Sequence, residues 1–421
     1  MSAPEKRRRA DRVLRRWAPG TIVLLSLAAG FYFANRSGND PSRYSNDFNV
    51  YYFASHEVLE GRDPYQRSLG DSTRYLYLPL LSELMIPLAL LPLPIAAYIW
   101  FLIGAASVIA TAGMSASMAG ETSSTRSRWL HTLVFLLAPL FVVRFALDNF
   151  DLGQVNPLVG ALAVAHIILY ERDRKLWSAA TLVVAVSIKL TPAVLIAYHL
   201  ARRRFKYAAV CFALFASVTA LSFAPFGSQA SSAFQTFFSR TLRNEQGFDL
   251  SYSGNQSLRG VIARLRGGEE SAQNPSEPLT IGLSLAMLGL AIVTTVLARS
   301  TTGAAASLFC CIALLSPLAW KAHFIFFLFP AAFVISEVAS NWRTKRSYAA
   351  GAALILAFSL FNLTSPKLTG LATAEWVDSH SLIFAGGVLV FAATLLCALD
   401  RNAMTSKFGF VTLLKTAEKS E

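Results

Sequence analysis

Long apolar runs recur along the whole chain, and they limit what it can fold into. A helix needs about 20 mostly apolar residues to cross roughly 30 Å of hydrocarbon. Apolar residues make up 54% of the 421 positions and charged residues only 15%, which is more apolar material than a soluble protein buries. The chain is therefore expected to be an all-α polytopic membrane protein. The clearest runs cover residues 94–117, 206–225, 279–298, 303–319, 323–340, 348–363 and 381–399.

Basic residues cluster between these runs, at 6–16, 172–175, 202–206, 343–346 and in the C-terminal tail. Cytoplasmic segments of membrane proteins are enriched in Lys and Arg. The net charge of +13 therefore indicates orientation in a membrane rather than binding to nucleic acid. With the basic clusters in the cytoplasm, the sequence predicts about twelve crossings and places both termini inside. The further crossings are residues 20–34, 129–146, 157–170, 176–188 and 190–200.

This topology divides the chain into three parts. Residues 1–17 form a basic cytoplasmic N-terminus, 18–400 a single integral membrane domain, and 401–421 a cytoplasmic tail. Long loops at 35–78 and 226–278 share the non-cytoplasmic face, and the second contains the low-complexity stretch "GGEESAQNPSEP". The N-terminal segment also has the charge and length of a signal peptide, but the many later crossings favour an uncleaved anchor.

Two runs, 176–188 and 190–200, are short for full crossings at about 1.5 Å per residue. We expect a hairpin of short helices whose tip, "KLTP", stops near the outer interface. A lysine at such a tip is costly unless it meets water, an acid or an anion. Lys189 is therefore a candidate for binding an anionic substrate, with snorkelling to the interface as the alternative. Arg144, near the end of a predicted crossing, is expected to snorkel.

The four cysteines all lie inside apolar runs and form no C-x-x-C, so they are interpreted as small core residues. They are Cys211, Cys310, Cys311 and Cys397. No group of two or three acids calls for a metal ion, although Asp148 and Asp151 are close enough in sequence to keep the question open. No cofactor is expected.

The first outer loop contains "NDFNVYYFASHEVLEGRDPY", residues 46–65, which is unusually polar and aromatic for this chain. If residues 47–60 are helical, Asp47, Tyr51 and Ser55 share one face. A carboxylate held there can accept a proton from an incoming hydroxyl. The alternative is that Asp47 is the first-turn acid of an interfacial helix, with Tyr51 and Tyr52 as belt aromatics.

Other polar groups collect on the same face in short motifs. Amides and tyrosines hydrogen-bond sugar hydroxyls, tryptophan stacks on sugars, and Lys or Arg binds phosphate. Each motif also has a structural explanation, as a helix cap, a glycosylation acceptor in "NQS", a belt aromatic or an interfacial histidine. The residues are Tyr75, Tyr77, Gln154, Asn156, Asn255, Gln256, Arg259, Trp320 and His323.

Taken in order, these motifs resemble glycosyltransferase family 87, membrane enzymes of the GT-C superfamily that include polyprenyl-phosphate-mannose-dependent α-mannosyltransferases. The resemblance runs from residue 47 to about 330. Leu78 and Pro79 stand where the family often has two prolines, and Ala322 and His323 where it often has two histidines. The matching pieces are "D-x3-YY-x-A" (47–54), "L-x-G-x-x-P-Y" (59–65), "Y-x-Y-x-P" (75–79), "GQ-x-N" (153–156), "KLTP" (189–192), "GNQS" (254–257) and "SP-x-x-W" (316–320).

The resemblance implies a GT-C type fold of about 12 helices with long outer loops. It also implies a polyprenyl-phosphate-linked sugar donor, with mannose as the expected sugar, and a glycan or glycolipid acceptor. Transfer would take place on the outer face of a bacterial plasma membrane, among membrane lipid. Asp47 is the expected general base of an inverting displacement, a reaction that also needs cations for the departing phosphate.

The site residues follow from combining the resemblance with this chemistry. Lys189 is the leading phosphate-binding residue, with Arg259 and His323 as secondary ones. The substrate-binding residues are Tyr51, Tyr52, Tyr75, Tyr77, Gln154, Asn156, Asn255, Gln256 and Trp320.

Two other classes of function stay open at this point. Twelve spans and a buried cation also suit a secondary transporter or a flippase of a lipid-linked or anionic solute. However, transporter sites lie near the bilayer midplane, whereas the polar residues here gather on one face. A scaffold protein without chemistry is the third possibility.

Overall fold

The computed structural model describes Gly30 and residues 47–66, 74–120, 128–242, 249–267 and 278–399. The predicted anchor at 20–34 and both predicted cytoplasmic ends therefore lie outside the described residues, apart from Gly30. The described residues form helices and no β-strand, which confirms the predicted all-α class.

Among the described residues, five helical segments are long and apolar enough to cross a bilayer. Two further pairs are each bent, by 58° and 59°, and each pair can act as one broken span. The chain is therefore an integral membrane protein. The five segments are α4 (Leu93–Gly120), α10 (Phe205–Phe223) with its continuation to Thr241, α14 (Pro278–Leu297), η5 with α16 (Lys321–Ser340), and α17 with η6 (Lys345–Leu363); the bent pairs are α5 (Arg128–Phe141) with α6 (Val143–Leu152), and α19 (Leu371–Ser379) with α20 (Leu382–Ala398).

Several predicted crossings are shorter apolar helices, so the total of twelve stays a prediction. One short helix, α3, was not predicted. The short apolar helices are α3 (Pro79–Ala89), α7 (Asn156–Glu171), α8 (Lys175–Ile188), η2 with α9 (Thr191–Ala201), and α15 (Thr301–Leu314).

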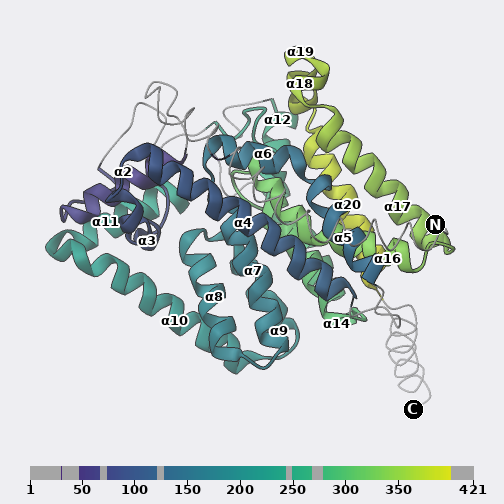
Figure 1. Cartoon of the computed structure of the whole chain (residues 1–421), viewed down its shortest axis with the longest axis horizontal. Coiled ribbons are helices and arrows are strands. Elements are labelled where there is room, and N and C mark those ends of the chain that lie inside the picture. Colours follow the sequence, from purple (N-terminus) through teal and green to yellow (C-terminus); the bar gives the residue numbers. More distant parts are fainter. Residues whose placement is uncertain are drawn as a thin grey trace, which may run out of the picture.

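The interior of the bundle is formed by α15 and α16. Every residue of α15 from Thr302 to Leu314 is buried, and so is α16 from Leu328 to Ser336. In contrast, α10 and α14 expose large apolar side chains such as Phe212 and Leu285. Such exposed apolar faces are what lipid-facing helices require. Figure 1 shows α10 and α17 at opposite edges of the molecule.

One face of the molecule gathers short helices, along the upper edge of Figure 1. They include α2 (Asp47–Leu59), α6, α12 (Leu258–Leu265) and α19. The prediction of a helix over 47–60 is confirmed by α2. Within the segment 226–278, predicted to be a long outer loop, the described residues include the short helices α11 and α12. The remaining elements are η3 (Ala224–Gln229), α11 (Ala230–Phe237), η4 (Phe238–Leu242) and α18 (Pro366–Thr369).

The predicted hairpin is also present. Helix α8 ends at Ile188, and the chain returns through η2 and α9. Lys189 takes an extended conformation (φ −147°, ψ 124°), and Pro192 begins the next turn. Lys189 therefore stands at the tip, as the "KLTP" motif predicts.

Two expectations about buried residues have different outcomes. All four cysteines are buried and unpaired by disulfides, which confirms that they are core residues. The expectation that Arg144 snorkels is wrong, because its guanidinium is buried and donates to the Phe361 carbonyl (3.1 Å) and to Thr364 Oγ1 (3.0 Å). These partners lie more than 200 positions away in sequence, which no local pattern reveals.

Candidate active site

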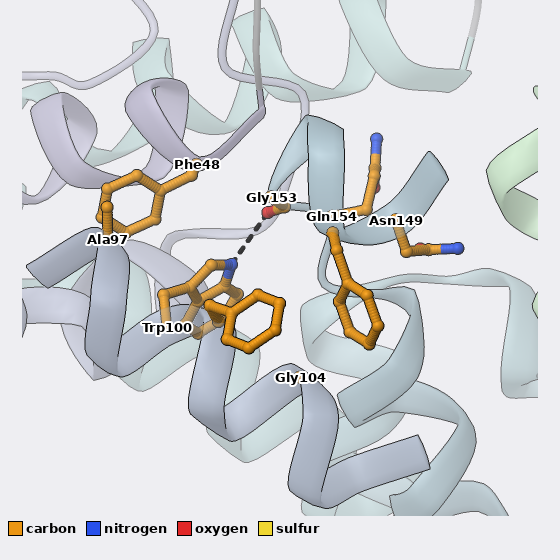
Figure 2. A pocket seen from close by; sticks show the side chains of 9 residues that line it. Phe48, Ala97, Trp100, Gly104, Asn149, Gly153 and Gln154 are labelled. Atoms are coloured by element: carbon orange, nitrogen blue, oxygen red, sulfur yellow. Dashed lines mark hydrogen bonds between the residues drawn. The ribbon is translucent and has the colours of Figure 1, made fainter. Parts of the chain in front are cut away.

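A glycine at the turn between α6 and α7 brings the first outer helix into the site. Gly153 ends α6 with a left-handed conformation (φ +62°), and its carbonyl accepts a hydrogen bond from the Trp100 indole at 2.8 Å (Figure 2). A Cβ at this position would lie 2.5 Å from Phe48 Cβ and 3.3 Å from the Phe48 nitrogen. Only glycine therefore permits both the backbone conformation and the contact with the first turn of α2.

This contact places Asp47 beside Gln154. The Gln154 amide donates to Asp47 Oδ2 at 2.5 Å, and its Oε1 lies 3.5 Å from the Tyr51 hydroxyl. Tyr51 donates to the Tyr77 hydroxyl at 3.0 Å, and Tyr77 also interacts with the Asp47 carboxylate. Asp47, Tyr51, Tyr77 and Gln154, four residues from three predicted motifs, thus form one hydrogen-bonded group, the Asp47 network.

The Asp47 carboxyl has a raised pKa. Its removal from water raises the pKa from the usual value of 3.8 to about 6, although the Lys189 charge and the Gln154 hydrogen bond act in the opposite direction. A carboxylate that is more basic than usual is suited to accept a proton.

Lys189 belongs to a second group, built from amides. Its ammonium donates to Asn156 Oδ1 at 2.7 Å, and Asn156 Nδ2 donates to Asn149 Oδ1 at 3.0 Å. The Asn149 amide nitrogen is fully used by the carbonyls of Phe145 and Ala322, each at 2.7 Å. Asn149 can therefore offer only its oxygen to Asn156. The Asn156 amide nitrogen faces this oxygen, so the Asn156 oxygen faces Lys189.

Asn149 is a residue that the sequence reasoning missed. It was passed over because it stands inside "DNFDLGQVNP" with no motif of its own. Its spacing of seven from Asn156, across the α6–α7 turn, is the signal that could have revealed it. We call Lys189, Asn156 and Asn149 the Lys189 network.

The two networks influence each other without a direct ion pair. Asp47 and Lys189 interact electrostatically, but no salt bridge joins this described pair. His323 lies next to the Lys189 network, is buried, and interacts with the Lys189 charge. Among the described residues, His323 Nδ1 has no hydrogen-bond partner. The geometry thus brings together a carboxylate, an ammonium and an imidazole from α2, the α8–η2 tip and η5 (Lys321–Phe327).

One cleft touches both networks. Figure 2 shows it between α4 and the α6–α7 turn, with Phe48 and Trp100 on one side of Gly153, and Gln154 and Asn149 on the other. Its lining residues include members of α4, a membrane-spanning helix, and of both networks of the site. The lining residues are Phe48, Ala97, Trp100, Phe101, Gly104, Asn149, Phe150, Gly153 and Gln154.

Two of the predicted tyrosines have structural partners instead of facing Asp47. The Tyr52 hydroxyl donates to the Leu91 carbonyl at 2.8 Å and ties α2 to the end of α3. The Tyr75 hydroxyl donates to the Leu78 carbonyl at 2.7 Å and accepts from the Ser82 amide at 3.0 Å. Tyr75 packs against Tyr77 with ring centroids 5.8 Å apart, so it contacts the Asp47 network through the Tyr77 ring.

The "GNQS" motif likewise holds two loops together. Asn255 donates to the carbonyls of Leu250 and Pro317 and accepts from the amides of Ser257 and Ala319, and it is buried. The buried Gln256 amide donates to the Ser253 and Asp378 carbonyls, and its oxygen accepts from the Phe384 amide. Their side chains are thus engaged with the protein.

Two further predicted residues, Trp320 and Arg259, lie near this motif. Trp320 is half-buried and packs edge-on against Tyr252, with centroids 5.6 Å apart. Arg259 on α12 is half-buried, and burial lowers the pKa of its guanidinium. Within the described part of the chain, no carboxylate pairs with this guanidinium and no hydrogen bond is made by it. No interaction links Arg259 to Lys189, so the structure does not bring these two predicted phosphate ligands together.

A model of glycosyltransferase family 87 matches residues 75–319. This is more than half of the chain. The chain belongs to glycosyltransferase family 87.

Its curated relatives include two mycobacterial enzymes. The polyprenol-phosphate-mannose-dependent alpha-(1-2)-phosphatidylinositol mannoside mannosyltransferase of Mycobacterium tuberculosis is 26% identical over 345 residues, 77% of this chain and 76% of the relative. The pentamannoside mannosyltransferase of Mycolicibacterium smegmatis, also polyprenol-phosphate-mannose-dependent, is 29% identical over 328 residues, 75% and 74% of the two chains.

Membership of glycosyltransferase family 87 confirms the resemblance and identifies the chain as a membrane glycosyltransferase. The family match includes the turn at 153–156 and the tip at 189–192. Asp47 lies before the matched range, so the family match does not include it. Within the described residues, no group of three or more His, Cys, Asp or Glu side chains is arranged to hold a metal ion.

Proposed function

We propose that this family 87 member transfers a mannosyl group from a polyprenyl-phosphate donor to a hydroxyl of a glycolipid or glycan. The donor and the sugar are supported by the names of both curated relatives, which are polyprenol-phosphate-mannose-dependent mannosyltransferases. The glycolipid acceptor is supported by the same names, since both act on phosphatidylinositol mannosides. The observation that carries the proposal is the electrostatic interaction between Asp47 and Lys189, whose networks each contribute one residue, Gln154 and Asn149, to the same cleft.

In this proposal Asp47 is the general base of a single displacement. The acceptor oxygen attacks the anomeric carbon of mannose, and its proton moves to the Asp47 carboxylate. The bond from the anomeric carbon to the phosphate oxygen breaks on the opposite side, and polyprenyl phosphate leaves with the bonding electrons. The product is therefore inverted at the anomeric carbon. Gln154 and Tyr77 hold the carboxylate in place.

Lys189 stabilises the departing phosphate. An ammonium has three donors, of which Asn156 takes one, so two remain for phosphate oxygens. His323 is the second phosphate ligand of this proposal because it lies beside Lys189. Arg259 is assigned to another part of the donor or acceptor, since no interaction links it to Lys189. A polyprenyl phosphate leaves without being protonated, so one base and nearby cations are sufficient.

The proposal also includes the orientation of the enzyme. We place the site on the outer face of a bacterial plasma membrane, with residues 1–17 and 401–421 in the cytoplasm and 18–400 as one membrane domain. The distribution of basic residues supports this orientation. The cleft between α4 and the α6–α7 turn supports an approach of the lipid-linked donor from the side of α4, a membrane-spanning helix.

The experiment that tests the reaction class uses purified protein in detergent. It is given a panel of radiolabelled polyprenyl-phosphate sugars together with phosphatidylinositol mannoside. The proposal predicts transfer from the mannose donor, with an inverted linkage in the product by NMR. Product formation in detergent, where no gradient exists, is not expected of a transporter. Transfer from another sugar only would overturn the assignment of mannose.

A further inference from the structure

A second group of charged residues lies beside the proposed site and takes no part in the two networks. It consists of Arg144 and Asp148 on α6, Lys321 on η5, and Asp378 on α19. Lys321 and Asp378 form a salt bridge of 2.7 Å. Arg144 interacts electrostatically with Asp148 and Asp378, and Asp148 also interacts with Lys321. We call these four residues the α6–α19 cluster.

Two members of the cluster are almost fully buried and yet incompletely bonded. Arg144 and Asp378 are each only 7% exposed. Among the described residues, Arg144 Nη2 and Asp378 Oδ1 have no hydrogen-bond partner. Leaving a buried charged donor or acceptor unpaired is costly. Both atoms are therefore available to a partner beyond the described residues, such as a bound ligand.

The chemistry of the unpaired atoms limits what that group can be. Arg144 Nη2 can only donate and Asp378 Oδ1, as a carboxylate, can only accept, so a ligand that satisfies both atoms must both accept and donate. A hydroxyl does both. Asp148 adds a second, half-buried carboxylate that accepts no hydrogen bond from the described residues. Two carboxylates make the cluster a poor phosphate site, whereas neighbouring hydroxyls of a sugar satisfy carboxylate and guanidinium together.

Two elements, α6 and η5, carry residues of both the cluster and the proposed site, and they place the two next to each other. Asp148 precedes Asn149 of the Lys189 network on α6, and Lys321 stands two residues before His323 on η5. The Asn149 amide donates to the carbonyl of Ala322, between these two η5 residues, at 2.7 Å. The Lys321 side chain is 26% exposed, so the cluster can be reached from outside.

We propose that the α6–α19 cluster is the subsite that holds the sugar headgroup of the acceptor, through its hydroxyl groups. The inference rests on the proposed glycosyl transfer. Asp148 and Asp378 accept from sugar hydroxyls, and Arg144 donates to one of them. The salt bridge to Lys321 fixes α19 over the headgroup.

The variant Asp148→Asn tests this subsite, since it keeps the shape of a half-buried side chain and removes its charge. The KM for phosphatidylinositol mannoside should rise by about 10- to 100-fold, the loss expected for a hydrogen bond to a charged group. The KM for polyprenyl-phosphate mannose should change by less than about twofold. The matched control is Asp151→Asn, the same change at an exposed position of α6, for which neither KM should move. An unchanged acceptor KM in D148N, or an equal rise of both KM values, would overturn the proposal.

A binding measurement separates this inference from the proposed reaction. Saturation-transfer NMR of methyl α-mannoside with the detergent-solubilised protein should give ring-proton signals for the wild type, and D148N and D378N should both lose them. Melting curves of the variants show whether they remain folded. Sugar binding that depends on Asp148 without any transfer would support the subsite and overturn the proposed function. Equal signals from wild type and D148N, or no signal from the wild type, would overturn the subsite.

Discussion

The Asp47 carboxylate accepts a hydrogen bond from the Gln154 amide, 107 positions further along the chain, at 2.5 Å. This bond joins the first outer helix to the α6–α7 turn. It exists because Gly153 lets Phe48 approach the turn closely. The position of the proposed base is thus determined by a residue that has no functional group.

Replacing Gly153 with alanine should separate the two parts of the site. Alanine would have to adopt φ +62° and would place Cβ 2.5 Å from Phe48. Strain of this kind costs about 1–3 kcal/mol, and relief by moving α2 would remove Asp47 from Gln154. We expect kcat to fall by at least about tenfold.

The matched control for this change is Gly61→Ala. Gly61 has nearly the same conformation (φ +67°), but nothing lies within 4 Å of its added Cβ. The control therefore carries the backbone strain without the contact. Similar losses of kcat in both variants would show that strain, rather than the approach of Phe48, is responsible.

The activity should depend on pH through Asp47. A general base must be deprotonated, and the pKa of Asp47 is raised to about 6, so kcat/KM should fall as the pH drops below about 6. The Lys189 charge lowers this pKa. In Lys189→Met the acid limb of the profile should therefore move to higher pH, in addition to the loss of activity. An acid limb near pH 4 in the wild type, or an unmoved limb in K189M, would argue against Asp47 as the titrating group.

Asn149 should act as a positioning residue for Lys189. In Asn149→Asp, the carboxylate would face the carbonyls of Phe145 and Ala322 and could not donate to them. Because Lys189 then loses its orientation, the KM for the donor should rise by about tenfold or more. The acid limb should also shift upward, as in K189M. The exposed Asn341→Asp serves as control. A donor KM that stays normal in N149D would contradict this role.

Asn255 should contribute to stability rather than to the chemistry. Its side chain makes four hydrogen bonds, two within the 249–257 loop and two to residues 317–319. Asn255→Ala leaves several buried groups unpaired and should lower the stability by at least about 2 kcal/mol. Thermal inactivation should be faster, while the donor KM of the surviving enzyme stays unchanged. A raised donor KM without loss of stability would instead support direct substrate binding.

The sequence predicted the parts of the fold that depend on local pattern. Apolar run length located most of the long helices, and the polar periodicity of 47–60 located α2. The number of crossings could not be derived, because a helix such as α7 or α15 is apolar for too few residues to distinguish a span from a buried segment. Arg144 was misjudged for a related reason, since its partners near Phe361 are brought close only by packing of distant helices.

For the site, the residue types were informative but their partners were not. Asp47, Gln154, Asn156 and Lys189 follow from motif and chemistry, and the structure brings them together. Tyr52 and Asn255 belong to equally distinctive motifs, yet their polar atoms bond to the protein backbone. The sequence does not show whether a hydroxyl or an amide side chain faces a substrate or a backbone carbonyl. Asn149 went unnoticed because its importance lies in the direction of its amide.

The most direct test of the account is the kcat of Asp47→Asn with polyprenyl-phosphate mannose and phosphatidylinositol mannoside. Asparagine keeps the shape of the side chain but cannot take the acceptor proton. If Asp47 is the general base, kcat should fall by about 10²- to 10⁴-fold, with a donor KM close to that of the wild type. A kcat within a few fold of the wild type would contradict the central claim and move the base elsewhere.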